Sequence, residues 1–175
     1  MPRNETQALP RLAILTTGGT FEKRYLESVG GLGFVDTCLG VLTTHARLAY
    51  RPRIEEVLLL DSLDMSDKER NLILKRVVKA KENHLVIVHG TDTMTLTART
   101  LQDGLGKDTK KTVVFTGAMV PVAHQNSDGV FNLGLAVAAC QIAAPGVYIA
   151  MSGRVYKADQ VEKNYRKKLF LPSKR

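Results

Sequence analysis

Five short apolar runs alternate along the chain with stretches of helical pattern. They span residues 11–16, 57–60, 85–89, 112–116 and 147–151, and each ends in a polar or glycine-rich turn. This alternation is typical of βα units, in which parallel strands are joined by helices that pack on the sheet. We therefore predict an α/β fold of three layers, with a largely parallel sheet between helices on both faces.

The stretches between the runs carry helix signals. Ser66 and Glu69 have the spacing of a capping box, in which the serine hydroxyl and the glutamate carboxylate each accept a hydrogen bond from the other's backbone amide. Apolar residues recur at helical spacing over residues 94–105 and again over residues 131–142, and a glycine or a Pro-Gly pair follows each stretch. These apolar stripes are predicted to lie in the core.

Length and composition indicate a single globular domain over residues 1–175. The chain is 44% apolar and 24% charged. A domain of this length buries roughly 70% of the surface that its unfolded chain exposes. A core can therefore form without disulfides or metals.

Residues 18–40 interrupt the alternating pattern. They contain six glycines and few periodic apolar residues. Glycine-rich segments near a strand end serve either as plain surface loops or as lids that close over a site. We expect a mobile lid loop here, with a plain surface loop as the alternative.

Positive charge is concentrated at the C-terminal end. The formal net charge is +8, and residues 154–175 contribute eight basic and two acidic residues. A basic chain can bind nucleic acid, but no RNA-binding motif accompanies this segment, and its aromatic residues are few, namely Tyr156, Tyr165 and Phe170. We expect a solvated or subunit-packing segment and no nucleic-acid partner.

Several classes of protein are disfavoured by the sequence. No apolar run approaches the roughly 18 to 20 residues of a membrane-spanning helix or forms a signal-peptide core, so we expect a cytoplasmic protein without a membrane partner. Cys38 and Cys140 lie far apart without a zinc-binding pattern, and His89 has no evident second ligand. Dinucleotide and P-loop fingerprints do not occur. We predict neither a metal nor a cofactor, and a packing role for His89.

Four of the apolar runs end in segments rich in hydroxyl, carboxylate or glycine. These segments are residues 16–20, 61–64, 89–93 and 116–119, and ligands collect beyond the carboxyl ends of parallel strands. Each segment alone also fits a structural role, because Gly18-Gly19 can form a tight turn while Thr20 and Asp92 can cap helices. Together they indicate a site.

This combination of residues suits acyl transfer without a metal. A threonine hydroxyl is a weak nucleophile at neutral pH and needs a neighbouring base. A partly desolvated lysine, oriented by an aspartate, can serve as that base. Backbone amides at the glycine turn and around Ala118 would then stabilise a tetrahedral oxyanion.

Four segments resemble the bacterial-type L-asparaginase and glutaminase family, in matching order and at compatible spacing. The resemblance runs from about residue 12 to residue 163, and the TGGT and HGTDT pair is highly specific. It implies the fold of the N-terminal catalytic domain of these enzymes. The segments are TTGGTFEKRY, DSLDMSD, HGTDTMTLTARTL and TGAMVPVAHQNSDGVFNLGLAVA.

The resemblance implies catalytic roles for five residues. Thr20 matches the primary nucleophile, and Tyr25 matches the lid tyrosine that helps to activate it. Thr91 matches the threonine of the proton relay, and Asp92 matches the aspartate that binds the substrate's α-amino group. Lys163 matches the lysine of a Thr-Lys-Asp triad, by a count without gaps from residue 146.

The resemblance also implies a set of substrate-binding residues. Ser62 matches the residue that holds the α-carboxylate, Gly19 belongs to the substrate-binding turn, and Ala118 matches a residue whose backbone faces the side-chain amide. Leu63 is a departure, because larger members have a glutamine there that helps to hold the α-amino group. We expect a weaker or differently arranged grip at this position.

A second departure is length. Typical members of the family are about twice as long, with a C-terminal domain that closes the site of a neighbouring subunit. The chain resembles the short, single-domain L-asparaginases, without the usual C-terminal domain, or else a fragment. We expect a homo-oligomer, a dimer or tetramer, in which the basic C-terminal segment packs near its own or a neighbour's site.

The resemblance implies hydrolysis of L-asparagine to L-aspartate and ammonia, with Thr20 attacking the side-chain amide carbon or assisting water to do so. Two alternatives stay open. One is an amidase that acts on glutamine or on an aminoacyl-tRNA amide. The other is a non-catalytic asparagine-binding module.

Overall fold

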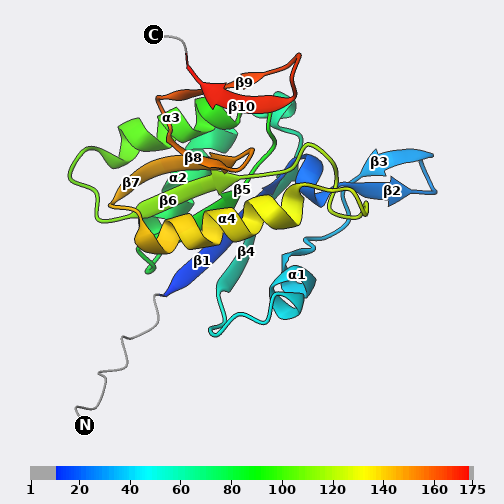
Figure 1. The fold of residues 1–175 in the computed structure, drawn as a ribbon, viewed down its shortest axis with the longest axis horizontal. Helices are drawn as coiled ribbons and strands as arrows, with labels where there is room; N and C mark the ends of the chain where they lie inside the picture. The colour runs from blue at the N-terminus through cyan, green and yellow to red at the C-terminus, as the bar shows by residue number, and fades with distance from the viewer. Residues whose placement is uncertain (1–10, 174–175) are drawn as a thin grey trace.

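A six-stranded sheet forms the centre of the protein (Figure 1). The computed structural model describes residues 11–173. Five strands run parallel, and the last pairs antiparallel with its neighbour. In spatial order the strands are β4 (Arg53–Leu60), β1 (Leu12–Gly18), β5 (His84–Val88), β6 (Thr112–Thr116), β7 (Gly146–Met151) and β8 (Arg154–Lys157).

Helices cover both faces of this sheet, which confirms the predicted α/β class. On one face α2 (Asp67–Lys79) and α3 (Met94–Leu105) bury Ile73 and Leu101 in one core cluster. On the other face α1 (Leu39–His45) and α4 (Gly129–Ile142) bury Leu39 and Ala136 in a second cluster. Helix α4 crosses in front of the sheet in Figure 1.

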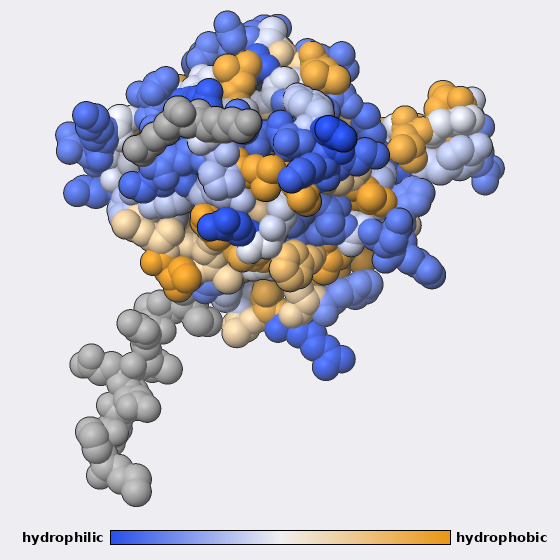
Figure 2. All heavy atoms as spheres, turned by 45° about the horizontal axis from the view of Figure 1, so that its top comes forward, coloured by the Kyte–Doolittle hydropathy of each residue, from blue (hydrophilic) through white to orange (hydrophobic). Residues whose placement is uncertain are grey.

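The outer face of α4 is apolar, and none of its residues is charged. Val130, Phe131 and Ile142 expose more than half of their surface. Figure 2 shows a band of apolar residues below a more hydrophilic upper region. Among residues 11–173, no helix is both long enough and apolar enough to cross a membrane.

The five predicted strands and three predicted helices are present, with some shifts at their ends. The capping box is confirmed, because the Ser66 amide donates to Glu69 Oε2 over 2.9 Å and the Lys68 amide donates to Ser66 Oγ over 3.2 Å. Strand β4 begins at Arg53, four residues before the apolar run at 57–60. The start of β4 contains charged residues, so it did not form part of the apolar run. One of these residues, Arg53, forms an ion pair with Glu82 over 2.9 Å.

Residues 18–40 contain short elements that the apolar pattern did not predict. A 3-10 turn (η1, Thr20–Glu22) leads into a hairpin of β2 (Arg24–Leu26) and β3 (Gly31–Gly33), and α1 then begins at Leu39. The hairpin projects from the body of the molecule (Figure 1). Strands of three residues are held by backbone pairing and are too short to show a periodic signal.

The basic C-terminal segment is folded over its described part, with most of its basic side chains exposed to solvent, while packing against another subunit stays a prediction. After β8, a hairpin of β9 (Val161–Asn164) and β10 (Leu169–Pro172) packs on the core cluster beneath α2 and α3, to which Val161 and Phe170 belong. Phe170 is fully buried, and the Tyr156 hydroxyl donates to the Phe170 carbonyl over 3.0 Å. These aromatic side chains hold the segment against the core.

The turns that follow β1, β4, β5 and β6 pack against one another through glycine. An ideal Cβ on Gly19 would lie 2.3 Å from Gly90 Cα, and one on Gly90 would lie 2.6 Å from Ser62 Cβ. An ideal Cβ on Gly117 would lie 2.4 Å from the His89 carbonyl oxygen. Only residues without a side chain allow such approaches. Four strand ends are thereby brought together at one edge of the sheet.

This packing predicts a large cost for a side chain at Gly19. Its φ of 73° is positive. Gly19→Ala should lower the free energy of unfolding by roughly 2 to 5 kcal/mol, since positive φ and overpacking each cost a few kcal/mol. The control is Gly134→Ala on the exposed face of α4, where nothing lies within 4 Å of an ideal Cβ. Gly134→Ala should raise the free energy of unfolding, measured by urea denaturation, by up to about 1 kcal/mol. Equal effects of the two substitutions would refute the packing argument.

Candidate active site

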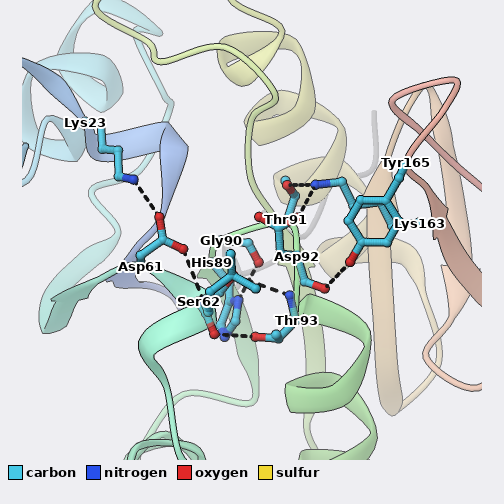
Figure 3. A network of polar contacts seen from close by, with 11 residues as sticks. Lys23, Asp61, Ser62, His89, Gly90, Thr91, Asp92, Thr93, Lys163 and Tyr165 are labelled. Atoms are coloured by element: carbon cyan, nitrogen blue, oxygen red, sulfur yellow. Dashed lines mark hydrogen bonds and ion pairs between the residues drawn. The ribbon is translucent and has the colours of Figure 1, made fainter. Parts of the chain in front are cut away.

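Lys163 joins the C-terminal hairpin to the turn that follows β5 (Figure 3). From β9, its Nζ donates to Thr91 Oγ1 over 2.7 Å and to Asp92 Oδ1 over 2.8 Å. The Lys163 side chain is 12% exposed. Lys157, six residues earlier, lies exposed on the edge strand β8. The structure therefore brings together Thr91, Asp92 and Lys163, the three residues of the predicted relay.

Tyr165 supports this contact and was not predicted as a site residue. It lies in the turn that directly follows β9, two residues after Lys163. The Lys163 Nζ lies 5.1 Å from the Tyr165 ring centroid, and the Tyr165 hydroxyl donates to the Asp92 carbonyl over 3.3 Å.

Ser62 is buried beside the same turn. The Thr93 amide donates to Ser62 Oγ over 3.3 Å, and Thr93 Oγ1 donates to the Ser62 carbonyl over 2.8 Å. Leu63, the next residue, is 68% exposed. The structure thus places Ser62 against the Thr91–Asp92 turn while the Leu63 side chain points into solvent.

An ion pair that was not predicted lies on the other side of Ser62 (Figure 3). Lys23 Nζ contacts Asp61 Oδ2 over 2.5 Å, and Asp61 Oδ1 accepts a hydrogen bond from the Leu63 amide over 3.1 Å. Burial alone would raise the pKa of Asp61, but the bonds from Lys23 and the Leu63 amide outweigh it and lower that pKa. Both residues lie within segments of the resemblance, Lys23 in TTGGTFEKRY and Asp61 in DSLDMSD, but neither was predicted as a site residue.

Thr20 and Tyr25 have different surroundings. Thr20 follows Gly19 directly and opens η1, so it lies at the turn packed against Gly90. Tyr25 lies on β2 of the projecting hairpin and is 63% exposed. Among the described residues, its hydroxyl forms no hydrogen bond with the other predicted site residues. The structure does not bring Tyr25 together with them.

Ala118 is fully buried in the turn after β6. Two residues at the start of α4 hold this turn. The Met119 amide donates to Asp128 Oδ1 over 2.9 Å, and Asn132 Nδ2 donates to the Gly117 carbonyl over 3.0 Å and to Asp128 Oδ2 over 2.8 Å. Asp128 and Asn132 were not predicted, although their i,i+4 spacing at a helix start was visible in the sequence.

His89 lies beneath the Thr91–Asp92 turn and has the packing role that was predicted. It is fully buried, and its ring stands edge-on to Phe115 with 5.8 Å between centroids. The Gly90 carbonyl, 2.8 Å from Nδ1, can only accept a hydrogen bond, so Nδ1 carries the proton. Burial lowers the pKa of His89 to about 4, and the nearby Arg70 adds to this effect. Over residues 11–173, no group of three metal-binding side chains occurs.

His89 makes stability depend on pH. A histidine pKa that is lowered on folding stabilises the protein above the unfolded value of about 6.5, and this stability is lost as pH falls toward the folded value. When the pH falls from 7.5 to 5, we expect protonation linked to His89 to lower the free energy of unfolding by on the order of 2 kcal/mol. His89→Asn keeps a donor for the Gly90 carbonyl but does not titrate. Urea denaturation at both pH values should therefore show a smaller loss in the variant, and an unchanged loss would contradict the assignment.

Comparisons with known proteins agree with this architecture. The family model described as "Asparaginase, N-terminal" matches residues 11–169. The "Probable L-asparaginase periplasmic" of Haemophilus influenzae is 34% identical over 89% of this chain and 46% of its own length. L-asparaginase 2 of Escherichia coli is 33% identical over 89% of this chain and 47% of its own length. A component of the glutamyl-tRNA(Gln) amidotransferase of Archaeoglobus fulgidus is 29% identical over 91% of this chain and 40% of its own length.

Solved structures of similar fold are named as asparaginases. The probable cytoplasmic L-asparaginase of Campylobacter jejuni has a TM-score of 0.75 at 29% identity, over 92% of this chain and 52% of that chain. The L-asparaginase of Thermococcus kodakarensis has a TM-score of 0.77, over 93% of this chain and 51% of that chain, and at 24% identity this likeness concerns the fold. The chain spans about half the length of the relatives it matches. From the extent of the family match and the identity to these relatives, the chain belongs to the asparaginase family.

Proposed function

We propose that this chain hydrolyses the side-chain amide of L-asparagine to L-aspartate and ammonia. The observation that carries the proposal is the contact of Lys163 Nζ with both Thr91 Oγ1 and Asp92 Oδ1, beside the turn that holds Thr20. Water adds across the amide, the carbon–nitrogen bond breaks, and the nitrogen leaves as ammonia. This chemistry uses side chains, backbone amides and water.

The Thr91–Lys163 hydrogen bond is the proposed path for the proton. A threonine hydroxyl becomes a useful nucleophile or proton donor only when a base accepts its proton. In its neutral form Lys163 Nζ can accept the Thr91 Oγ1 proton across this 2.7 Å contact, and the resulting ammonium can return the proton through the same contact. Asp92, 2.8 Å from the same nitrogen, holds the lysine in place and balances its charge.

Attack on the amide carbon comes from the Thr20 hydroxyl or from water that this hydroxyl orients. Thr20 follows the close contact of Gly19 with Gly90, which sets its main chain next to the Thr91 turn. Backbone amides at the Gly19 turn and around Ala118 are the proposed donors to the developing oxyanion. Glycine packing holds the Gly19 turn, and Asp128 holds the turn around Ala118, so these backbone amides need to move little when the oxyanion forms.

The polar groups around Ser62 suit an amino acid's two charged ends. Ser62 Oγ already accepts a hydrogen bond from the Thr93 amide, so its own proton is available for the α-carboxylate. Asp92 is the proposed acceptor for the α-amino group. Leu63 offers no polar side chain for that amino group, which agrees with an altered grip at this position.

The remaining proposals concern closure, assembly and location. The β2–β3 hairpin is proposed to fold over the bound substrate and so to bring Tyr25 toward Thr20. We also propose a homo-oligomer, which would cover further parts of the site, and a cytoplasmic location. One relative is named as periplasmic and one similar structure as cytoplasmic.

A second candidate function is hydrolysis of the amide of glutamine or of an aminoacyl-tRNA. It is supported by the 29% identity to the amidotransferase component of Archaeoglobus fulgidus. Ammonia release measured in parallel from asparagine and glutamine distinguishes the two candidates. No ammonia from either substrate, with asparagine still bound, would instead indicate a binding module.

Thr20→Ala should abolish the proposed activity. Loss of the nucleophilic hydroxyl should lower ammonia release from asparagine by about 10³-fold or more. Thr20→Ser keeps the hydroxyl and should keep part of the activity, and circular dichroism checks that both variants fold. Full activity in folded Thr20→Ala would remove Thr20 from the mechanism.

Lys163→Met should separate catalysis from binding. Without the lysine nitrogen, the Thr91 proton has no acceptor, and turnover should fall by about 10²- to 10⁴-fold. Binding of aspartate, measured by calorimetry, should stay within a few-fold of the wild type. The matched control is Lys157→Met on β8, which should keep full turnover. The opposite result for the two lysines would show that the count to Lys163 is wrong.

A further inference from the structure

We propose that Lys23 and Asp61 form a positioning pair that holds the Thr20 turn against the Ser62 turn. The proposal rests on the proposed function for its kinetic test and on the structure for a second, independent test. The two residues come from different turns at the same edge of the sheet, Lys23 after β1 and Asp61 after β4.

The turn that carries Thr20 is fastened to the end of β4 at both of its ends. At one end, the Gly19 amide donates to the Leu60 carbonyl over 2.9 Å. At the other end, Lys23 Nζ contacts Asp61 Oδ2 over 2.5 Å. Thr20 lies between these two links, and the Lys23 amide donates to the Thr20 carbonyl over 3.2 Å. A change at either link therefore acts directly on the Thr20 main chain.

Each charge of the pair has a second partner that limits its movement. The Lys23 ammonium lies 5.6 Å from the centroid of the Phe34 ring, just after β3, so it also contacts the return of the hairpin. Asp61 Oδ1 accepts from the Leu63 amide and so caps the turn that carries Ser62. The side chains are only 23% and 28% exposed, so solvent screens this pair less than an open surface pair.

The rest of the turn is anchored on the side away from Ser62. Phe21 is buried in the core cluster beneath α4, and its carbonyl accepts from the Val122 amide over 3.3 Å. The Glu22 carboxylate is buried and accepts from Thr37 Oγ1 over 2.7 Å and from the Cys38 amide over 2.9 Å. Loss of the Lys23–Asp61 pair should therefore leave the fold intact. It should let the Thr20 turn move only relative to the Ser62 turn.

The pair shares no hydrogen bond with Lys163, although the Lys163 charge also helps to lower the pKa of Asp61. Figure 3 shows Lys23 and Asp61 on one side of Ser62, and Thr91, Asp92 and Lys163 on the other. The groups that hold Ser62 and Asp92, namely Thr93 and Lys163, do not depend on Lys23. Substrate binding should consequently survive when the pair is broken, while the placement of Thr20 should not.

The kinetic test uses Lys23→Met, Asp61→Asn and the double variant. Misplacement of a reacting group by about 1 Å can cost roughly 10²-fold, so each single variant should lower kcat by roughly 10- to 100-fold with KM within about twofold. The double variant should be no slower than either single one, since all three break the same contact. Lys23→Arg keeps the ion pair and should restore most of kcat.

The matched control breaks an ion pair at the opposite end of the same strand. Arg53 Nε contacts Glu82 Oε1 over 2.9 Å at the start of β4, far along the strand from Asp61. Arg53→Met should leave kcat and KM unchanged. A raised KM with unchanged kcat in Lys23→Met, additive losses in the double variant, or losses equal to those of Arg53→Met would overturn the positioning proposal.

Hydrogen exchange gives a readout that needs no turnover. Amides of residues 19–23 should exchange faster in Lys23→Met than in the wild type, and Arg53→Met should not change them. If the wild type releases no ammonia, the proposed function fails while this measurement still decides the positioning pair. Unchanged exchange in Lys23→Met would overturn it.

Discussion

Close packing of backbone at the His89–Gly90 peptide is the constraint on which the candidate site depends. The turns after β1, β4 and β6 each approach this peptide within distances that a Cβ would fill. The His89 ring, neutral and buried, holds the Gly90 carbonyl from below. Gly19 and Gly117 meet this peptide through backbone atoms, and Gly90 meets the Ser62 side chain, so the main chain at Gly19, Ser62 and Gly90 is set by the packing of the strand ends.

Charged side chains complete this arrangement from above. Lys163 and Asp92 form one ion pair on the C-terminal hairpin side, and Lys23 and Asp61 form another at the end of β4. Each pair joins segments that the glycine packing alone leaves free to move, namely β9 in the first case and the Thr20 turn in the second. The candidate site thus combines closely packed turns with two ion pairs. The proposed lid, the β2–β3 hairpin, lies next to the Lys23–Asp61 pair.

The main elements could be predicted from the sequence because they rest on local signals, whereas the candidate site residues were named through motifs that resemble a family. Apolar periodicity indicated five strands and three helices, and the TGGT and HGTDT motifs singled out Thr20, Thr91 and Asp92. The small hairpins could not be predicted, since their strands of three or four residues carry no periodic pattern. Lys23 lies within the TTGGTFEKRY segment, but its role was missed because its partner, Asp61, is 38 residues away.

The sequence by itself determined the α/β class, the order of its main elements and the residue types gathered at the strand ends. Only the tertiary structure decided that the basic C-terminal segment folds back, so that Lys163 contacts Thr91 across 72 residues of chain. It likewise left Tyr25 exposed on the projecting β2–β3 hairpin. The physical reason is that periodicity and capping act between neighbours in the chain, whereas such contacts depend on how the sheet edge and the hairpins pack.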